Sequence, residues 1–404
     1  MTNLFRKPVQ CLPLAPGFVA VVALLAGCAT APGEPRAAAT AADRRVVPPA
    51  ERDRVLLDYR AATAALRAGD FDEAKARLDD AIVRIGGIIA NDADAARARS
   101  LFSAESTKPF VGEPYERAMA YFYRGILYWR DGELDNARAC FRSGQVIDSD
   151  PENERYDADY ILLDYLDGLA TAKLGGEGTE ALRRAQAHAG ENRPLPPPDP
   201  AANVLLFAEH GYGPRKYAAG PYGEQLRFYA DESPSRSMRL VLDGGRRIVP
   251  IPDYDDLNYQ AVTRGGRVMD HILGNKAVFK TNTAVAGDVA LAGSAYAYEQ
   301  GRRREREGKD DDSADFAAVG LGVLGIIGKI ASAATQPQAD TRQWDTLPQH
   351  LGFAALRLPP GEHAGTLEFL DRDGNVLERR SQSVTLSVHP TDRDTVVFLS
   401  EHKR

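Results

Sequence analysis

The chain has 404 residues, of which 26% are charged and 44% hydrophobic, and this composition excludes collagen-like, coiled-coil and wholly disordered chains. Its 50 basic and 57 acidic residues give a formal net charge of -7, which excludes a general nucleic-acid binder because such a protein needs a basic face. The length predicts two or three domains.

The first 28 residues have the pattern of an export signal. Arg6 and Lys7 precede an apolar run over residues 18–26 that is too short to span a bilayer. The next residues, Leu25-Ala26-Gly27-Cys28, resemble the lipobox of bacterial lipoproteins. The resemblance implies cleavage after residue 27, a covalent lipid with acyl chains such as palmitate on Cys28, and, because a neutral residue follows, the periplasmic face of the outer membrane. A plain secretory signal is the alternative.

The next two regions predict a tether and a helical domain. Residues 28–50 are rich in Ala, Pro and Thr without apolar periodicity, which is typical of a flexible tether. Across residues 51–190 apolar side chains recur at helical spacing. Three turn glycines each follow a small residue by seven positions, in the pairs Ala62 and Gly69, Gly125 and Gly132, and Gly168 and Gly175. This spacing resembles the tetratricopeptide repeat, which implies a concave surface that binds a partner. An unrelated helical bundle is the alternative.

Aromatic residues of this helical domain are candidates for contacts with a partner. They are Tyr121, Tyr128, Trp129 and Tyr165. Cys140, in a helical pattern, is assigned to packing because small buried cysteines are more common than reactive ones.

A proline-rich linker at residues 191–202 predicts a boundary, since proline-rich sequence continues neither helix nor sheet. Residues 203–404 contain short strand-like runs separated by turns, for which we predict an immunoglobulin-like β-sandwich. Residues 264–340 form an insertion rich in small residues, for which we predict a helical hairpin. Its glycine-rich segment, residues 316–334, could instead contact a membrane or mediate self-association. The predicted fold class is α+β.

Few residues indicate chemistry. The loop that carries His210, Tyr212, Arg215 and Lys216 could hold a carboxylate or a glycan, with a structural turn as the alternative. The seven histidines are scattered without the spacing of zinc ligands, so we predict no metal and no cofactor besides the lipid. No catalytic motif is present, and we predict a protein that is not an enzyme.

Together these features are similar to a family of uncharacterised bacterial envelope lipoproteins with tetratricopeptide-like repeats. The resemblance rests on the lipobox and on residues 110–117, 121–129, 203–216 and 340–348. It implies a non-enzymatic adaptor or scaffold that binds a protein partner in cell-envelope assembly, without nucleic acid. The alternative is a structural lipoprotein that assembles into homo-oligomers through residues 316–334, and an envelope hydrolase is a third reading.

Overall fold

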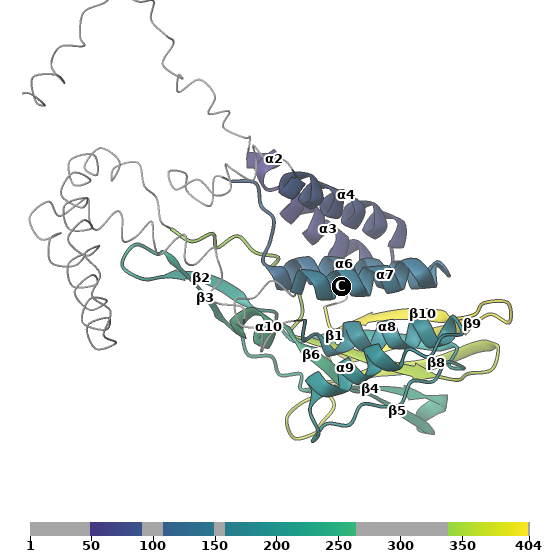
Figure 1. Ribbon diagram of the computed structural model, residues 1–404. Coiled ribbons are helices and arrows are strands. Elements are labelled where there is room, and N and C mark those ends of the chain that lie inside the picture. Colours follow the sequence, from purple (N-terminus) through teal and green to yellow (C-terminus); the bar gives the residue numbers. More distant parts are fainter. Residues whose placement is uncertain (1–48, 91–107, 149–157, 264–337, 403–404) are drawn as a thin grey trace, which may run out of the picture. The chain divides into compact units, whose positions relative to one another are not determined.

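The computed structural model describes residues 49–90, 108–148, 158–263 and 338–402 (Figure 1). The predicted signal, Cys28, nearly all of the tether and almost all of the predicted insertion, including residues 316–334, lie outside the described residues. The described residues all belong to one compact unit. Within the described ranges, no helix combines the length and the apolar character that a membrane span requires.

The fold is α+β, as the sequence predicts, and its described N-terminal part is helical. The helices are α2 (Pro49–Arg52), α3 (Arg54–Ala68), α4 (Phe71–Ala90), α6 (Pro114–Arg130), α7 (Leu134–Asp148), α8 (Ile161–Lys173) and α9 (Thr179–Ala189). Three pairs of helices form, α3 with α4, α6 with α7, and α8 with α9 (Figure 1). Neighbouring pairs are in contact through α4 and α6 and through α7 and α8. The sequence predicts that α4 ends at Gly86-Gly87, which is wrong, because the helix continues to Ala90.

Glycines occupy the turns of these pairs and two of the close crossings between their helices. Gly69, Gly132 and Gly175 follow the first helix of each pair with φ of 80°, 81° and 89°, a conformation that favours glycine. At the crossings, a Cβ on Gly125 would come within 2.5 Å of the Phe141 ring, and one on Gly168 within 2.5 Å of Leu182. Glycine therefore sets how closely these helices approach.

We predict opposite effects for two Gly→Ala substitutions in these helices. Gly125→Ala should destabilise the protein by about 1–3 kcal/mol, because the added methyl overpacks the α6–α7 contact. Gly86→Ala is the matched control, since its Cβ meets open space, and alanine should stabilise helix α4 by about 0.5–1 kcal/mol. Urea unfolding of both variants measures the difference, and equal effects at the two positions would contradict the close approach.

The C-terminal half contributes the strands and one short helix. The strands are β1 (Val204–His210), β2 (Arg215–Ala219), β3 (Gln225–Tyr229), β4 (Ser237–Leu242), β5 (Arg247–Ile251), β6 (Asp253–Asp256), β7 (His350–Leu356), β8 (Gly361–Leu370), β9 (Gln382–Val388) and β10 (Thr395–Ser400), and α10 spans Leu257–Thr263. One sheet, which we call the central sheet, has the order β10-β1-β7-β6. A second, the outer sheet, has the order β5-β4-β8-β9, and β2 and β3 form a separate hairpin.

Strand β1 shows how the layers pack, because every residue in it is buried. Leu205 and Phe207 join the apolar core that the helices form, whereas Val204, Leu206 and Ala208 join the core between the central and outer sheets. Alternate side chains of a strand point to opposite faces. The central sheet is therefore covered by helices on one face and by the outer sheet on the other.

The proline-rich segment connects α9 to β1, and residues on both sides of it share one apolar core. The predicted domain boundary stays a prediction. Residues 376–379 are one of the strand-like runs in the sequence, but they are not a strand in the structure, because that segment makes only a single bridge between Val376 and Leu370. Strand β6 is absent from the sequence prediction because its sequence, Asp-Tyr-Asp-Asp, has little strand propensity.

Candidate functional site

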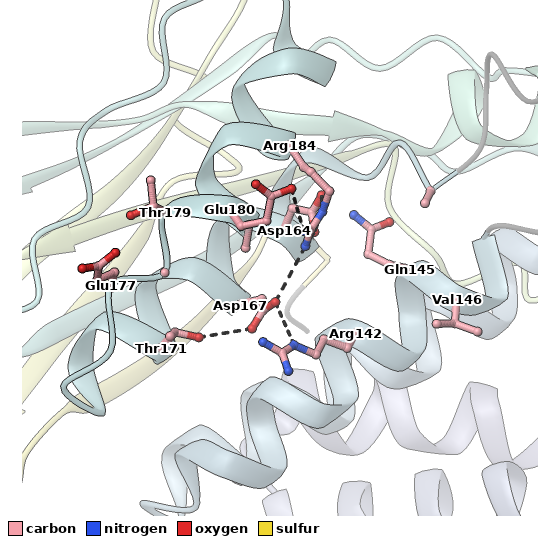
Figure 2. A pocket seen from close by; sticks show the side chains of 13 residues that line it. Arg142, Gln145, Val146, Asp164, Asp167, Thr171, Glu177, Thr179, Glu180 and Arg184 are labelled. Carbon is pink, nitrogen blue, oxygen red and sulfur yellow. Dashed lines mark hydrogen bonds and ion pairs between the residues drawn. The ribbon is translucent and has the colours of Figure 1, made fainter.

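A pocket of about 760 Å³ lies between α7, α8 and the start of α9 (Figure 2). Its shape depends on Gly178, which has φ of 64° and lies so close to α8 that a Cβ there would be 2.2 Å from the Gly168 carbonyl oxygen. This approach places Glu177 and Thr179 beside α8 at the edge of the pocket. The close approach of Gly178 to Gly168 thus shapes the pocket.

Two arginine–aspartate pairs line the interior of the pocket. Arg142 of α7 donates from Nε to Asp167 at 2.9 Å, and Arg184 of α9 donates from its terminal nitrogen to Asp164 at 2.8 Å (Figure 2). Both carboxylates are buried while both guanidinium groups are half-exposed. Burial raises the pKa of Asp164 and the Arg184 hydrogen bonds oppose that shift, while the hydrogen bond to Asp164 raises the pKa of Arg184.

The rest of the lining is mixed in polarity. Val146 of α7 is 69% exposed. Glu177 and Glu180 lie at the rim, where Glu180 is also paired with Arg183 at 2.7 Å. Gln145 donates to the Tyr160 carbonyl at 2.7 Å, and its buried Oε1 has no hydrogen-bond partner among the described residues. The pocket therefore combines an apolar contact, two half-exposed guanidinium groups and a rim with carboxylates.

The four aromatic residues predicted to contact a partner occupy different positions in the helices. Trp129 and Tyr165 are buried in the apolar core, where Trp129 donates from Nε1 to Asp394 at 2.8 Å and Tyr165 packs on Tyr254. Tyr121 is half-buried, and half-buried Tyr128 lies under the Arg124 guanidinium at 3.5 Å. None of the four lines the pocket between α7, α8 and α9. Helical periodicity does not distinguish aromatics that bind a partner from those that pack under a sheet.

The four predicted site residues in and beside the loop between β1 and β2 lie in two different environments. Tyr212 and Arg215 line a second pocket, of about 710 Å³. His210 and Lys216 are buried instead. The Lys216 ammonium binds groups of its own chain, donating to Glu116 at 2.6 Å and to the Arg342 carbonyl at 3.0 Å.

Buried charges connect the helices to the central sheet, and the sequence prediction did not include them. Glu209 of β1 accepts hydrogen bonds from Arg67 at 2.7 Å, from Tyr123 at 2.7 Å and from Ser400 at 2.6 Å.

Cys140 is a free, buried thiol, and burial raises its pKa to about 11. The thiol is therefore protonated and unreactive at neutral pH, which agrees with the packing role predicted for it.

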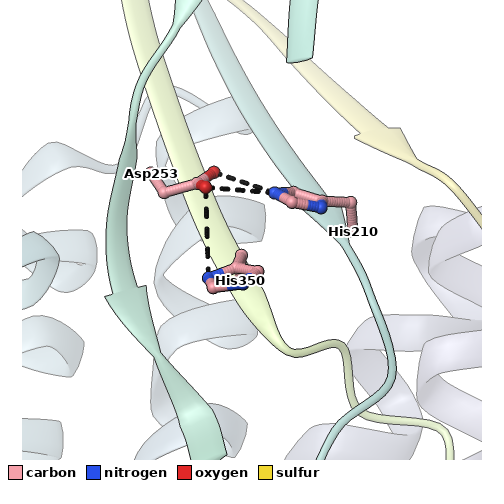
Figure 3. Close-up of side chains that lie close together, drawn as sticks. All are labelled: His210, Asp253 and His350. Carbon is pink, nitrogen blue, oxygen red and sulfur yellow. Dashed lines mark hydrogen bonds and ion pairs between the residues drawn. The ribbon is translucent and has the colours of Figure 1, made fainter. Parts of the chain in front are cut away.

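One group of side chains could hold a metal ion. His210, Asp253 and His350 each direct a ligand atom toward the others, and these atoms lie within 4.8 Å of one another (Figure 3). Spacing along the sequence could not reveal the group, because its members come from three different strands of the central sheet. The pocket could have been predicted from the sequence, because Asp164 and Asp167 lie three residues apart on the otherwise apolar helix α8.

Comparisons with protein-family models, curated proteins and solved structures found no match for this chain.

Proposed function

We propose that the protein is a non-enzymatic adaptor, anchored by a lipid on Cys28 to the periplasmic face of the outer membrane, that docks a protein partner in cell-envelope assembly. The anchor is supported by the Leu25-Ala26-Gly27-Cys28 tetrad directly after an apolar run. Lipid anchoring by several acyl chains needs no membrane-spanning helix.

The docking role is supported by the pocket between α7, α8 and α9. We infer that its occupant is an extended segment of the partner that carries a basic side chain. Glu177 and Glu180 at the rim favour a cation, and Arg142, which uses only Nε on Asp167, keeps N–H groups for a backbone carbonyl of the segment. This combination is the observation that carries the proposal.

We also propose that the three helix pairs are degenerate tetratricopeptide-like repeats and that the two sheets form a β-sandwich-like unit. The turn glycines and the close helix approaches at Gly125 and Gly168 support the repeats. The apolar core between the central and outer sheets supports the sandwich. A repeat array that binds partners through its surface requires no catalytic group.

The docking proposal predicts a loss of partner on charge reversal at the rim. With Glu177→Lys and Glu180→Lys combined, we expect at least about a tenfold weaker recovery of the partner, because two attractive contacts become repulsive. Purification of the lipidated protein from envelope extracts with quantitative mass spectrometry measures the recovery. Glu191→Lys, exposed and outside the pocket, is the control. Equal recovery with the reversed and control variants would overturn the docking role.

A further inference from the structure

Three polar side chains converge at one end of the central sheet. His210 ends β1 and lies directly opposite His350, which begins the antiparallel strand β7. Asp253 of β6 pairs with Gly352 of the same strand, two residues beyond His350. Since side chains two residues apart share a face of a sheet, all three project from one face. It is the face that packs elsewhere on the outer sheet, as Ala208 of β1 shows.

The backbone around Asp253 is shaped to hold this arrangement. The pairing of β6 with β7 shifts register between Asp253 and Asp255, which marks a β-bulge. Bulges redirect side chains and are frequent beside functional sites. Arg193 donates to the carbonyl oxygens of both Asp253 and Tyr254 and so fixes the bulged backbone. The backbone position of Asp253, and with it the place of its carboxylate, is therefore fixed by the fold.

The distances within the group suit coordination of a metal ion. The carboxylate oxygens of Asp253 lie 3.0 and 3.2 Å from His210 Nε2, and one of them lies 3.9 Å from His350 Nδ1 (Figure 3). Tetrahedral zinc with ligands at about 2.0–2.1 Å separates neighbouring ligand atoms by about 3.4 Å. The observed separations bracket that value, so small side-chain movements would complete the site.

The two imidazole rings of the group lie against each other. The His210 and His350 rings stack with centroids 4.7 Å apart, and each ring offers a nitrogen to the same ion. His210 is fully buried, and its Nδ1 has no hydrogen-bond partner among the described residues, so Nε2 carries the polar contacts of the ring.

We propose that His210, Asp253 and His350 bind one divalent transition-metal ion, such as Zn²⁺, that joins the ends of β1, β6 and β7. Two imidazoles and one carboxylate match the ligands of zinc and its neighbours rather than the all-oxygen sets of Ca²⁺ or Mg²⁺. The side chains of Asp253 and His350 are 28% and 20% exposed. The exposed side leaves a coordination position for water or another ligand.

The test uses the full chain in detergent, without an affinity tag, and Zn²⁺ and Co²⁺ as probes. We expect one Zn²⁺ per chain by calorimetry, visible absorption bands of protein-bound Co²⁺, and a rise of the thermal midpoint when Zn²⁺ is added. Asp253→Asn and His350→Gln should each weaken Zn²⁺ binding by at least about 100-fold, since even partners that only orient a ligand contribute 10–100-fold. Both replacements keep the side-chain size, which limits damage to the fold.

The controls are Asp373→Asn and His389→Gln, which change the same residue types at exposed positions outside the group. They should bind Zn²⁺ as the unsubstituted protein does. Far-UV circular dichroism checks that all four variants fold. If folded Asp253→Asn and His350→Gln retain the full Zn²⁺ affinity, or if the unsubstituted protein binds no Zn²⁺ or Co²⁺, the three residues are only a hydrogen-bonded group and the proposal is wrong.

Discussion

Replacing Asp394 by alanine is expected to lower the free energy of unfolding by about 3–5 kcal/mol, the cost of leaving a buried charge without its partner. Asp394 accepts a hydrogen bond from Lys173 at 2.7 Å, and both side chains are only 2% exposed. Its second oxygen accepts from the Trp129 indole at 2.8 Å. The substitution therefore leaves a buried ammonium with only the carbonyls of Pro200 and Ala202 and an indole N–H without an acceptor.

Denaturant unfolding followed by circular dichroism measures this effect. Asp392→Ala is the matched control, because that aspartate is exposed in the same loop, and it should change the stability by less than about 0.5 kcal/mol. A second comparison uses the double variant Lys173→Met with Asp394→Ala, which removes both charges and should recover part of the loss. An Asp394→Ala variant as stable as the control would contradict the buried pair.

Replacing Trp344 by alanine is expected to destabilise the protein by about 3–5 kcal/mol, as is typical of large aromatic truncations in a core. The Trp344 ring stacks on Tyr59 of α3 with centroids 4.0 Å apart and meets Tyr123 of α6 edge-on. Its backbone N–H donates to Glu116 at 2.7 Å. This side chain thus attaches the segment that precedes β7 to two helices, and its removal leaves a cavity among them.

The same unfolding measurement, with tryptophan fluorescence as a second probe, checks this prediction. Ile248→Ala is the control, because Ile248 is a large apolar residue that is half-exposed on β5, and its truncation should cost much less. Similar losses at Ile248 and Trp344 would show that the segment containing Trp344 is not held by the helical core.

The sequence was informative where periodicity and glycine spacing decide the local structure. The helix pairs follow from apolar residues at helical spacing and from glycine at the turns, where φ is positive. The covering of β1 on both faces could have been inferred from Val204-Leu205-Leu206-Phe207-Ala208, since a continuous apolar run is typical of a strand buried on both sides.

The polar interior could not be predicted in the same way. Glu209 and Arg67 are ordinary charged residues in the sequence, and only the fold brings them to a buried separation of 2.7 Å. The group of His210, Asp253 and His350 depends on strand order and on a bulge, neither of which leaves a spacing pattern. Trp129 and Tyr165 were predicted to contact a partner, but both are buried in the core. Aromatic residues on a helix show the same sequence pattern whether they bind a partner or fill a core.

The most direct test of the adaptor proposal is site-specific photo-crosslinking in living cells, with the photoreactive residue at position 146 in the pocket and, as the control, at position 83. Val146 and Val83 are 69% and 73% exposed, on α7 and α4, and only Val146 lines the pocket. We predict that position 146 captures one envelope protein through a segment carrying Lys or Arg, that position 83 does not, and that Glu177→Lys with Glu180→Lys abolishes the capture. Capture of the same proteins at both positions, or only of further copies of this chain, would contradict the account.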